Sequence, residues 1–248
     1  MKLTEGYVLP ILLIIALAAI GLNYAYWNET LTINGTVNTG EVKVIWNYDP
    51  WEHPSVQVYD DYYTPSTVAS ASWTPIDDHT FSVTFNNLYP GVMLKFQGYA
   101  RNMGTIPVKF DHIDITIIND PKGVANYLYV VPTDTYISWD QDGNGPIPPH
   151  PAHSPVWGGY TNFPFTLLDD AINSGPIPGW PYTYAVPKFV LNPPTTPGDW
   201  RTAGRMAFCD EEGNGCIRLK VDPNAPDSIE GATLTFTVSF TFIQWNAP

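Results

Sequence analysis

The chain has 248 residues, of which 44% are hydrophobic and only 14% are charged, so it holds enough apolar residues for a folded core and is not a disordered chain. Its formal net charge of −13 excludes a general affinity for nucleic acid or anionic membrane surfaces, because both would repel it. The 25 prolines and 19 glycines favour strands joined by turns over long helices, so we expect a mostly β protein.

The chain begins with an export signal or a membrane anchor, which we assign to residues 1–25. The run from Val8 to Leu22 is almost wholly apolar and carries no charged side chain. It is shorter than the roughly 20 residues of a comfortable transmembrane helix, which favours a signal peptide cleaved after Ala25. With either interpretation we expect the rest of the chain to be extracellular.

Residues 26–40 have the pattern of a strand with one apolar face, followed by a short joint. Leu31, Ile33 and Val37 fall on odd positions while Asn and Thr fill the even ones, the period of two of a half-buried strand. A lone strand is not stable, and no tight Asn-Gly or Asp-Gly hairpin turn follows it, so it must join a sheet elsewhere. Burial alone does not decide whether that sheet belongs to the same copy of the chain or to a neighbouring one.

Two N-glycosylation sequons fall within this segment, at Asn28-Glu29-Thr30 and Asn34-Gly35-Thr36. Both asparagines lie on the face opposite the apolar residues. Glycans at Asn28 and Asn34 would therefore decorate the strand while its apolar face is buried.

A series of alternating runs after residue 40 predicts a β-sandwich or jelly roll. In the run 108–117 the apolar residues change from even to odd positions, which predicts a β-bulge near Asp111 and His112. The strongest strand pattern is the last, over residues 233–246. We assign residues 41–248 to one sandwich domain, with expected strands at 41–46, 56–59, 68–73, 81–85, 92–99, 108–117 and 233–246.

Residues 119–205 are expected to contain an extended insertion rich in proline and aromatic residues. The stretch 146–198 holds 13 of the 25 prolines, interleaved with tryptophan, tyrosine and phenylalanine, a density of rings that indicates order rather than a flexible linker. Residues 166–174 are its one expected helix.

Cys209 and Cys216 enclose the sequence DEEGNG. In an exported chain they predict a disulfide across a hairpin turn, with free thiols as the alternative. Residues 206–209 and 216–221 are the strands expected to pair around it.

No common catalytic motif is present. HExxH and the G-x-S-x-G elbow are missing, and the prolines around His150 and His153 forbid a helix that would bring both to one metal. Adjacent carboxylates such as Asp169 and Asp170 are better explained as solvated turns than as acid–base pairs. We expect no enzymatic activity and no required cofactor.

One cation site is predicted from spacing. Asp140, Asp142 and Asn144 in DQDGNG match the first half of a calcium loop, where alternate oxygens converge on the ion. The glutamate that would complete an EF-hand is replaced by Pro151, so calcium is a secondary hypothesis. Asp210, Glu212 and Asn214 repeat the spacing, where an acidic turn is the simpler interpretation.

The chain resembles the TasA/camelysin family and its archaeal relatives, the bundling-pilus subunits. The resemblance rests on an ordered set of motifs that covers about a third of the chain. They are YAYWNETLTINGTVNTGEVKV (24–44), NNLYPG (86–91), ARNMGTIPVKFDHIDI (100–115) and LTFTVSFTFIQWN (234–246). The acidic residue that usually follows Pro-Gly in this family is Val92 here.

The resemblance implies an all-β jelly-roll subunit with an N-terminal donor strand, which polymerises outside the cell as each copy lends that strand to the next. It implies a homopolymer found in biofilm matrix or cell-to-cell bundles, with filaments that associate laterally. Leu31, Ile33 and Val37 would be the buried residues of the donor strand. The alternatives are a membrane-anchored monomeric binding module for surface glycans and, with no zinc motif to support it, a metallopeptidase.

Overall fold

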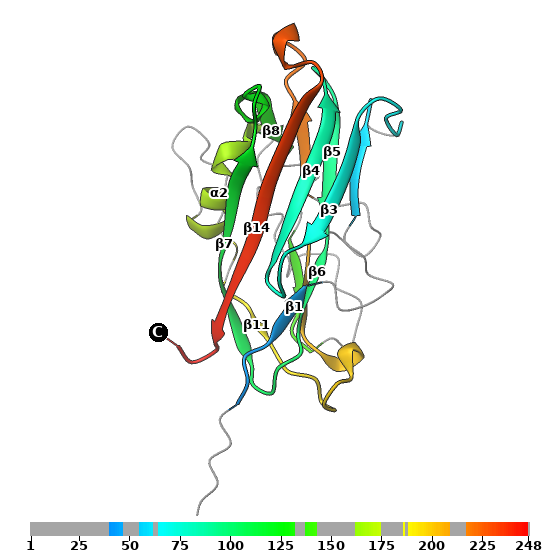
Figure 1. Ribbon diagram of the computed structural model, residues 1–248. Coiled ribbons are helices and arrows are strands. Elements are labelled where there is room, and N and C mark those ends of the chain that lie inside the picture. The colour runs from blue at the N-terminus through cyan, green and yellow to red at the C-terminus, as the bar shows by residue number, and fades with distance from the viewer. Residues whose placement is uncertain are drawn as a thin grey trace, which may run out of the picture. The chain divides into compact units, whose positions relative to one another are not determined.

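The structure is a computed structural model that describes residues 40–46, 55–61, 64–131, 137–142, 162–174, 186, 188–208 and 217–247. The chain divides into two compact units, Met1–Thr39 and Gly40–Pro248. All described residues belong to the second unit, which is a sandwich of antiparallel strands in two layers (Figure 1). The prediction of an all-β sandwich is confirmed.

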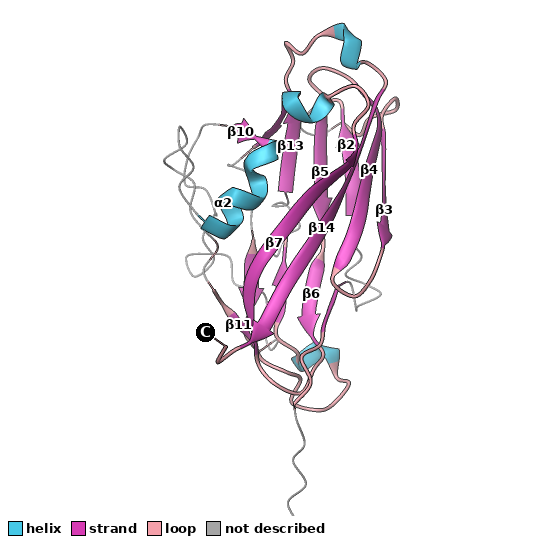
Figure 2. Cartoon of the chain, turned by 60° about the vertical axis from the view of Figure 1, so that its left-hand side comes forward, coloured by secondary structure: helices cyan, strands magenta, loops and turns pink. Residues whose placement is uncertain are grey.

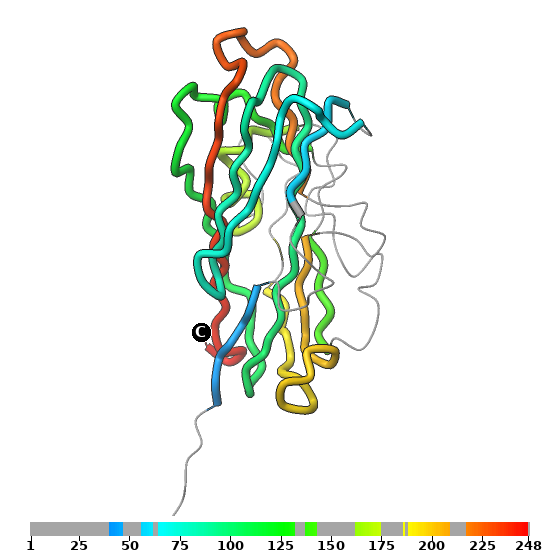
Figure 3. The backbone as a smooth tube through the Cα atoms, turned by 45° about the vertical axis from the view of Figure 1, so that its right-hand side comes forward, coloured from blue at the N-terminus to red at the C-terminus, as the bar shows by residue number. Residues whose placement is uncertain are grey.

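The first layer is organised around a long strand made of β5 (Met93–Gln97) and β6 (Tyr99–Asn102), which only Gly98 separates (Figure 3). Each half of this strand belongs to its own sheet, with the strand orders β1-β6-β12-β9 and β10-β8-β13-β5-β2. The other strands of the layer are β1 (Val44–Trp46), β2 (Ser55–Tyr59), β8 (Leu128–Val130), β9 (Ser138–Asp140), β10 (Phe163–Pro164), β12 (Arg205–Ala207) and β13 (Ile217–Val221).

The neighbours of the long strand are interrupted in the same way. β12 pairs antiparallel with β6, and β13 pairs antiparallel with β5, so β12 and β13 run in one direction along one partner. The prediction that the segments around the cysteines form a hairpin with each other is therefore wrong. Residues 209–216, which join β12 to β13, lie outside the described residues.

The second layer has the strand order β11-β7-β14-β4-β3 and is built on the longest strands. Its strands are β3 (Ser70–Pro75), β4 (Thr80–Leu88), β7 (Val108–Asn119), β11 (Val190–Leu191) and β14 (Ala232–Gln244). β7 pairs with β14 with a register shift: Thr241 lies opposite His112 and Phe242 opposite Phe110, so Asp111 is the extra residue. The predicted bulge is confirmed, and it explains how both Phe110 and Ile113 point into the core.

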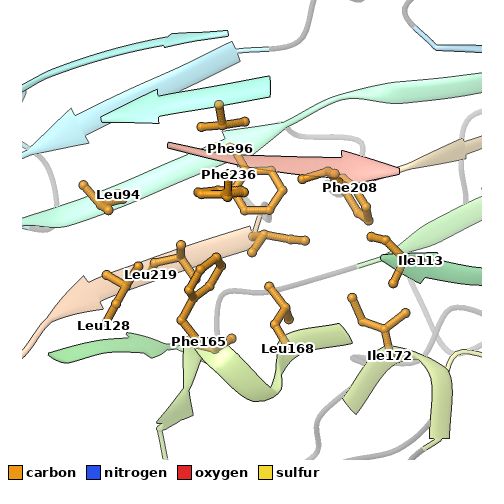
Figure 4. Close-up of a cluster of buried hydrophobic side chains, with 14 of the residues drawn as sticks. Leu94, Phe96, Ile113, Leu128, Phe165, Leu168, Ile172, Phe208, Leu219 and Phe236 are labelled. Atoms are coloured by element: carbon orange, nitrogen blue, oxygen red, sulfur yellow. The ribbon is translucent and has the colours of Figure 1, made fainter. Parts of the chain in front are cut away.

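The core between the layers is dominated by aromatic rings. Phe236 of β14 is fully buried and packs within 5.0–6.1 Å, centroid to centroid, of Phe85, Phe96 and Phe165 (Figure 4). Trp46 stacks on Phe240 at 4.6 Å. A Cβ on Gly98 would come within 2.4 Å of the Trp46 ring, so the ring fits against the strand because residue 98 has no side chain.

Residues between 119 and 205 contribute directly to the sandwich. β8 and β9 pair with β13 and β12 within the first layer, and β11 pairs with β7. The predicted helix is present as the 3-10 turn η4 (Phe165–Leu167) and the helix α2 (Leu168–Ser174), which lies beside β7 (Figure 2). The remaining 3-10 turns are η2 (Val124–Tyr127), η5 (Trp200–Thr202) and η6 (Asp227–Ile229).

Candidate functional site

The residues predicted for calcium lie at the end of β9. Asp140 accepts a hydrogen bond from the Asp142 backbone N–H at 3.1 Å and lies 3.9 Å from Nε of Arg205. Asp142 accepts a hydrogen bond from the Asn192 side chain at 2.6 Å. Asn144 lies outside the described residues, and within those residues no group of three or more His, Cys, Asp or Glu side chains could hold a metal ion. Calcium binding stays a prediction.

The other residues singled out in the sequence also lie outside the described part of the chain. These are the donor-strand residues, the sequon asparagines, the two cysteines and the histidine pair: Leu31, Ile33, Val37, Asn28, Asn34, Cys209, Cys216, His150 and His153.

A cluster of titratable side chains lies at the bulge of β7. His112 Nδ1 is 2.7 Å from Asp111 and its Nε2 is 3.2 Å from Asp114, while Lys188 is 3.4 Å from Asp111. The hydrogen bond from His112 lowers the pKa of Asp111 below its usual value. These side chains are part-exposed, and none of them lines the groove described next.

A groove lies between the layers where the edge strand of each layer comes to the same side of the body. β2 ends its sheet in the first layer, and β3 ends the second layer (Figure 2). The groove has a volume of about 340 Å³. Its lining comes from both strands and from the segment that joins them: Val56, Gln57, Val58, Tyr59, Pro65, Ser66, Ala69, Ser70 and Ala71.

The inward side chains of both strands make this groove largely apolar. Val58 and Ala69 are buried, and Val56, Ala71 and Trp73 are partly buried against the core. The even-numbered residues of β3 are exposed instead, as the alternation of a strand requires. An extended segment in the groove would therefore meet apolar side chains beneath it and water above it.

Both strands turn unpaired backbone groups toward the groove. Ile76 donates its N–H to Thr80, so the even residues of β3 bond to β4, and the N–H and C=O of Ala71 and Trp73 point away from it. On β2 the even residues point outward in the same way, since Ser66 donates to the Val58 carbonyl. The described residues supply no partner for the outward groups of Val56, Ala71 and Trp73.

One end of the groove is closed by the connection between β2 and β3. Asp60 donates its N–H to Thr64, which brings residues 64–66 back along the edge of β2. Tyr89 donates its hydroxyl to Asp60 and lies 3.4 Å from Ser66 Oγ. Hydrogen bonds from Ser66 and Tyr89 lower the pKa of Asp60, and burial raises the pKa of Tyr89. At the other end Pro75 has no N–H to offer a further strand.

On the opposite side of the second layer, side-chain and backbone groups cover the edge of β7 beyond the short strand β11. The Asn173 amide of α2 accepts from the Ile113 N–H at 2.9 Å and donates to the Ile113 carbonyl at 2.7 Å, as a neighbouring strand would. Phe110 donates to the Phe189 carbonyl at 3.0 Å, and Asp169 accepts from the Ile115 N–H. Capping of this kind stops an edge from pairing with another chain. In the described residues, residues 64–66 cover the edge of β2 at Val58 and Tyr59, while the outward backbone groups of Val56 on β2 and of Ala71 and Trp73 on β3 lack such capping.

Sequence reasoning did not locate this groove, because it forms between strands that pair with different partners.

Among the residues that the structure describes, no helix has the length and apolar character to span a membrane. Comparison with protein-family models gives no match, and comparisons with curated proteins and with solved structures give none either.

Proposed function

We propose that the protein is a subunit of an extracellular filament that polymerises by donor-strand complementation, without catalysis. The groove between β2 and β3 is the acceptor, and residues 28–38 of a neighbouring copy are the donor. The observation that carries this proposal is the pair of facing strand edges, apolar beneath and with outward backbone groups on both sides.

The donor segment suits the groove in length and in pattern. From Leu31 to Val37 an extended chain spans about 20 Å, similar to the six residues of β3. Its odd residues would lie on the apolar floor, and its even Asn and Thr residues would face water. Glycans at Asn28 and Asn34 would then point away from the groove.

Chain length supports a neighbouring copy as the source of the segment. Val56 pairs with Phe96 and Val44 with Asn102, so Val56 in the groove and Val44 in β1 are about 20 Å apart along the long strand. Gly40 lies further from the groove than Val44, since Glu41 already bonds to Thr105. Because only three residue steps separate Val37 from Gly40, a reach of about 10 Å, the chain between them is too short to bring a copy's own Val37 to its own groove.

The energies are of the right size for a stable junction. Burying Leu31, Ile33 and Val37 would contribute about 1.5–3 kcal/mol each. Association costs about 4–15 kcal/mol, so burial alone gives little surplus. Ladder hydrogen bonds to the outward N–H and C=O groups of Val56, Ala71 and Trp73, at about 0.5–1.5 kcal/mol each, would supply the rest. The unpaired edges are therefore as important to the proposal as the apolar floor.

The sequence supports the same function independently. The ordered motifs that resemble the TasA/camelysin family include the donor segment, the turn 86–91 and the last strand. A low fraction of charged residues suits a surface covered by copies of itself or by glycans. By this proposal the mature chain is a homopolymer on the cell surface, and filaments bundle laterally.

Deletion of residues 26–37 tests the proposal. The exported deletion variant is expected to stay monomeric, near the mass of one chain by light scattering, while the intact protein forms filaments. A finer variant replaces Leu31, Ile33 and Val37 by Ser, and its matched control replaces Thr30, Thr32 and Thr36 on the opposite face by Ser, which keeps both sequons. Filaments from the deletion variant would refute the proposal, and an intact protein that never assembles would favour the monomeric binding module.

A further inference from the structure

The apolar face of the donor segment contains a gap. Its odd positions read Leu31, Ile33, Gly35 and Val37, so three branched side chains surround one position with no side chain. Glycine inside a strand weakens it and often marks a place where another group approaches closely. The gap at Gly35 therefore predicts a bulky side chain on the surface against which this face packs.

The floor of the groove has the complementary pattern. The inward positions of the β3 edge read Ala69, Ala71, Trp73 and Pro75, with one large side chain among small ones. Ala69 and Ala71 line the groove, and Trp73 lies next on the same face, only partly buried against the core. The side chains on this face are thus small at Ala69 and Ala71 and large at Trp73.

We propose that Gly35 of one copy lies against Trp73 of the next and sets the register of the junction. This inference rests on the proposed function and adds the register to it. Large donor side chains then lie beside small residues of β3, and the indole of Trp73 lies across the glycine, as aromatic side chains cover glycines on neighbouring strands.

The pairing holds for either direction of the donor strand. Gly35 has Ile33 and Val37 two positions away on its two sides, and Trp73 has Ala71 and Pro75. Whether the donor runs parallel or antiparallel to β3, one branched residue meets Ala71 and the other meets Pro75. A slip by two residues would put Ile33 or Val37 onto Trp73, and a slip by one would turn the polar face inward.

The test uses the full chain with Gly35→Leu, Trp73→Ala, and both substitutions together. Gly35→Leu is expected to raise the critical concentration for assembly by about tenfold or more, because an enlarged side chain is forced onto the indole. The double variant is expected to assemble near the wild-type concentration. Thr32→Leu on the outer donor face and Thr74→Ala on the outer face of β3 are the matched controls and are expected to change little.

Mixing distinguishes a neighbouring copy from the same copy. Labelled Gly35→Leu chains are expected to enter filaments only when Trp73→Ala chains are present, since those chains offer the enlarged groove. Rescue in the double variant without rescue in the mixture would mean that the segment fills its own body, and would overturn the proposal.

The remaining outcomes are also decisive. No rescue in either form, while deletion of residues 26–37 still abolishes filaments, would refute the register and leave the proposed function standing. Filaments that survive the deletion would remove both. If Trp73→Ala does not fold by circular dichroism, Trp73→Leu with Gly35→Ala gives the same test with a smaller change, and absence of rescue there refutes the register.

Discussion

Asn173→Ala should destabilise the body by removing the cap on β7. The wild-type amide makes two hydrogen bonds to Ile113, at 2.9 Å and 2.7 Å, in a partly buried position. At about 0.5–1.5 kcal/mol for each bond, their loss should cost about 1–3 kcal/mol. For a domain of this size, that lowers the melting temperature by roughly 2–10 °C.

The measurement is the urea midpoint and the melting temperature of non-assembled protein, with Asn119→Ala as the control. Asn119 is exposed at the end of the same strand, so its replacement should change the midpoint little. The variant should also aggregate more readily on heating, because the freed edge can pair with other chains. A midpoint for Asn173→Ala equal to that of the control would refute the assignment of α2 as an edge cap.

Gly204→Ala should unfold or strongly destabilise the protein. The added Cβ would come within 2.3 Å of the Gln141 carbonyl oxygen and 2.6 Å of the Asn192 nitrogen, both backbone atoms. A variant whose melting curve by circular dichroism equals that of the wild type would contradict this. Asp169→Asn should raise the melting temperature near neutral pH, because burial raises the pKa of Asp169 above its usual value of 3.8 and its charge is costly in the folded state. When the pH falls below that raised pKa, the wild-type carboxyl takes up a proton and the cost of its charge is lost. The stability advantage of the variant should therefore shrink toward pH 3.8. An advantage that grows on acidification would show the sign to be wrong. Excess chelator should lower the thermal stability of filaments if calcium binds at Asp140 and Asp142, and unchanged stability would remove that hypothesis.

The parts of the fold that the sequence predicted well were those with a local signal. The change of parity between Phe110 and Ile113 identified the bulge in β7, because a period of two is disturbed by one extra residue. The alternation in residues 233–246 identified β14, and the helix expected at residues 166–174 is present as η4 and α2. These patterns depend only on residues close to one another in the chain.

The parts that were missed depend on distant partners. β8 and β9 are three residues each, too short for a pattern, and they are strands because β13 and β12 lie beside them. Residues 209–216 have the composition of a turn, and composition did not show that β12 and β13 pair with β6 and β5 and not with each other. Asn173 caps Ile113 from 60 residues away, and no local signal marks that role.

The same distinction applies to the candidate site. The sequence predicted a strand within residues 26–40 that needs a partner, and the structure supplies a groove between two sheet edges with outward backbone groups at Val56, Ala71 and Trp73. The pairing of Gly35 with Trp73 required both, because the gap on the donor face gains meaning only when the uneven floor of β3 is known.

A high-resolution density map of filaments sheared from the cell surface tests the central claim most directly. The account predicts residues 28–38 of one copy between β2 and β3 of the next, with Leu31, Ile33 and Val37 turned inward. The same segment folded onto its own body, or a groove between β2 and β3 left empty along the filament, would contradict the account.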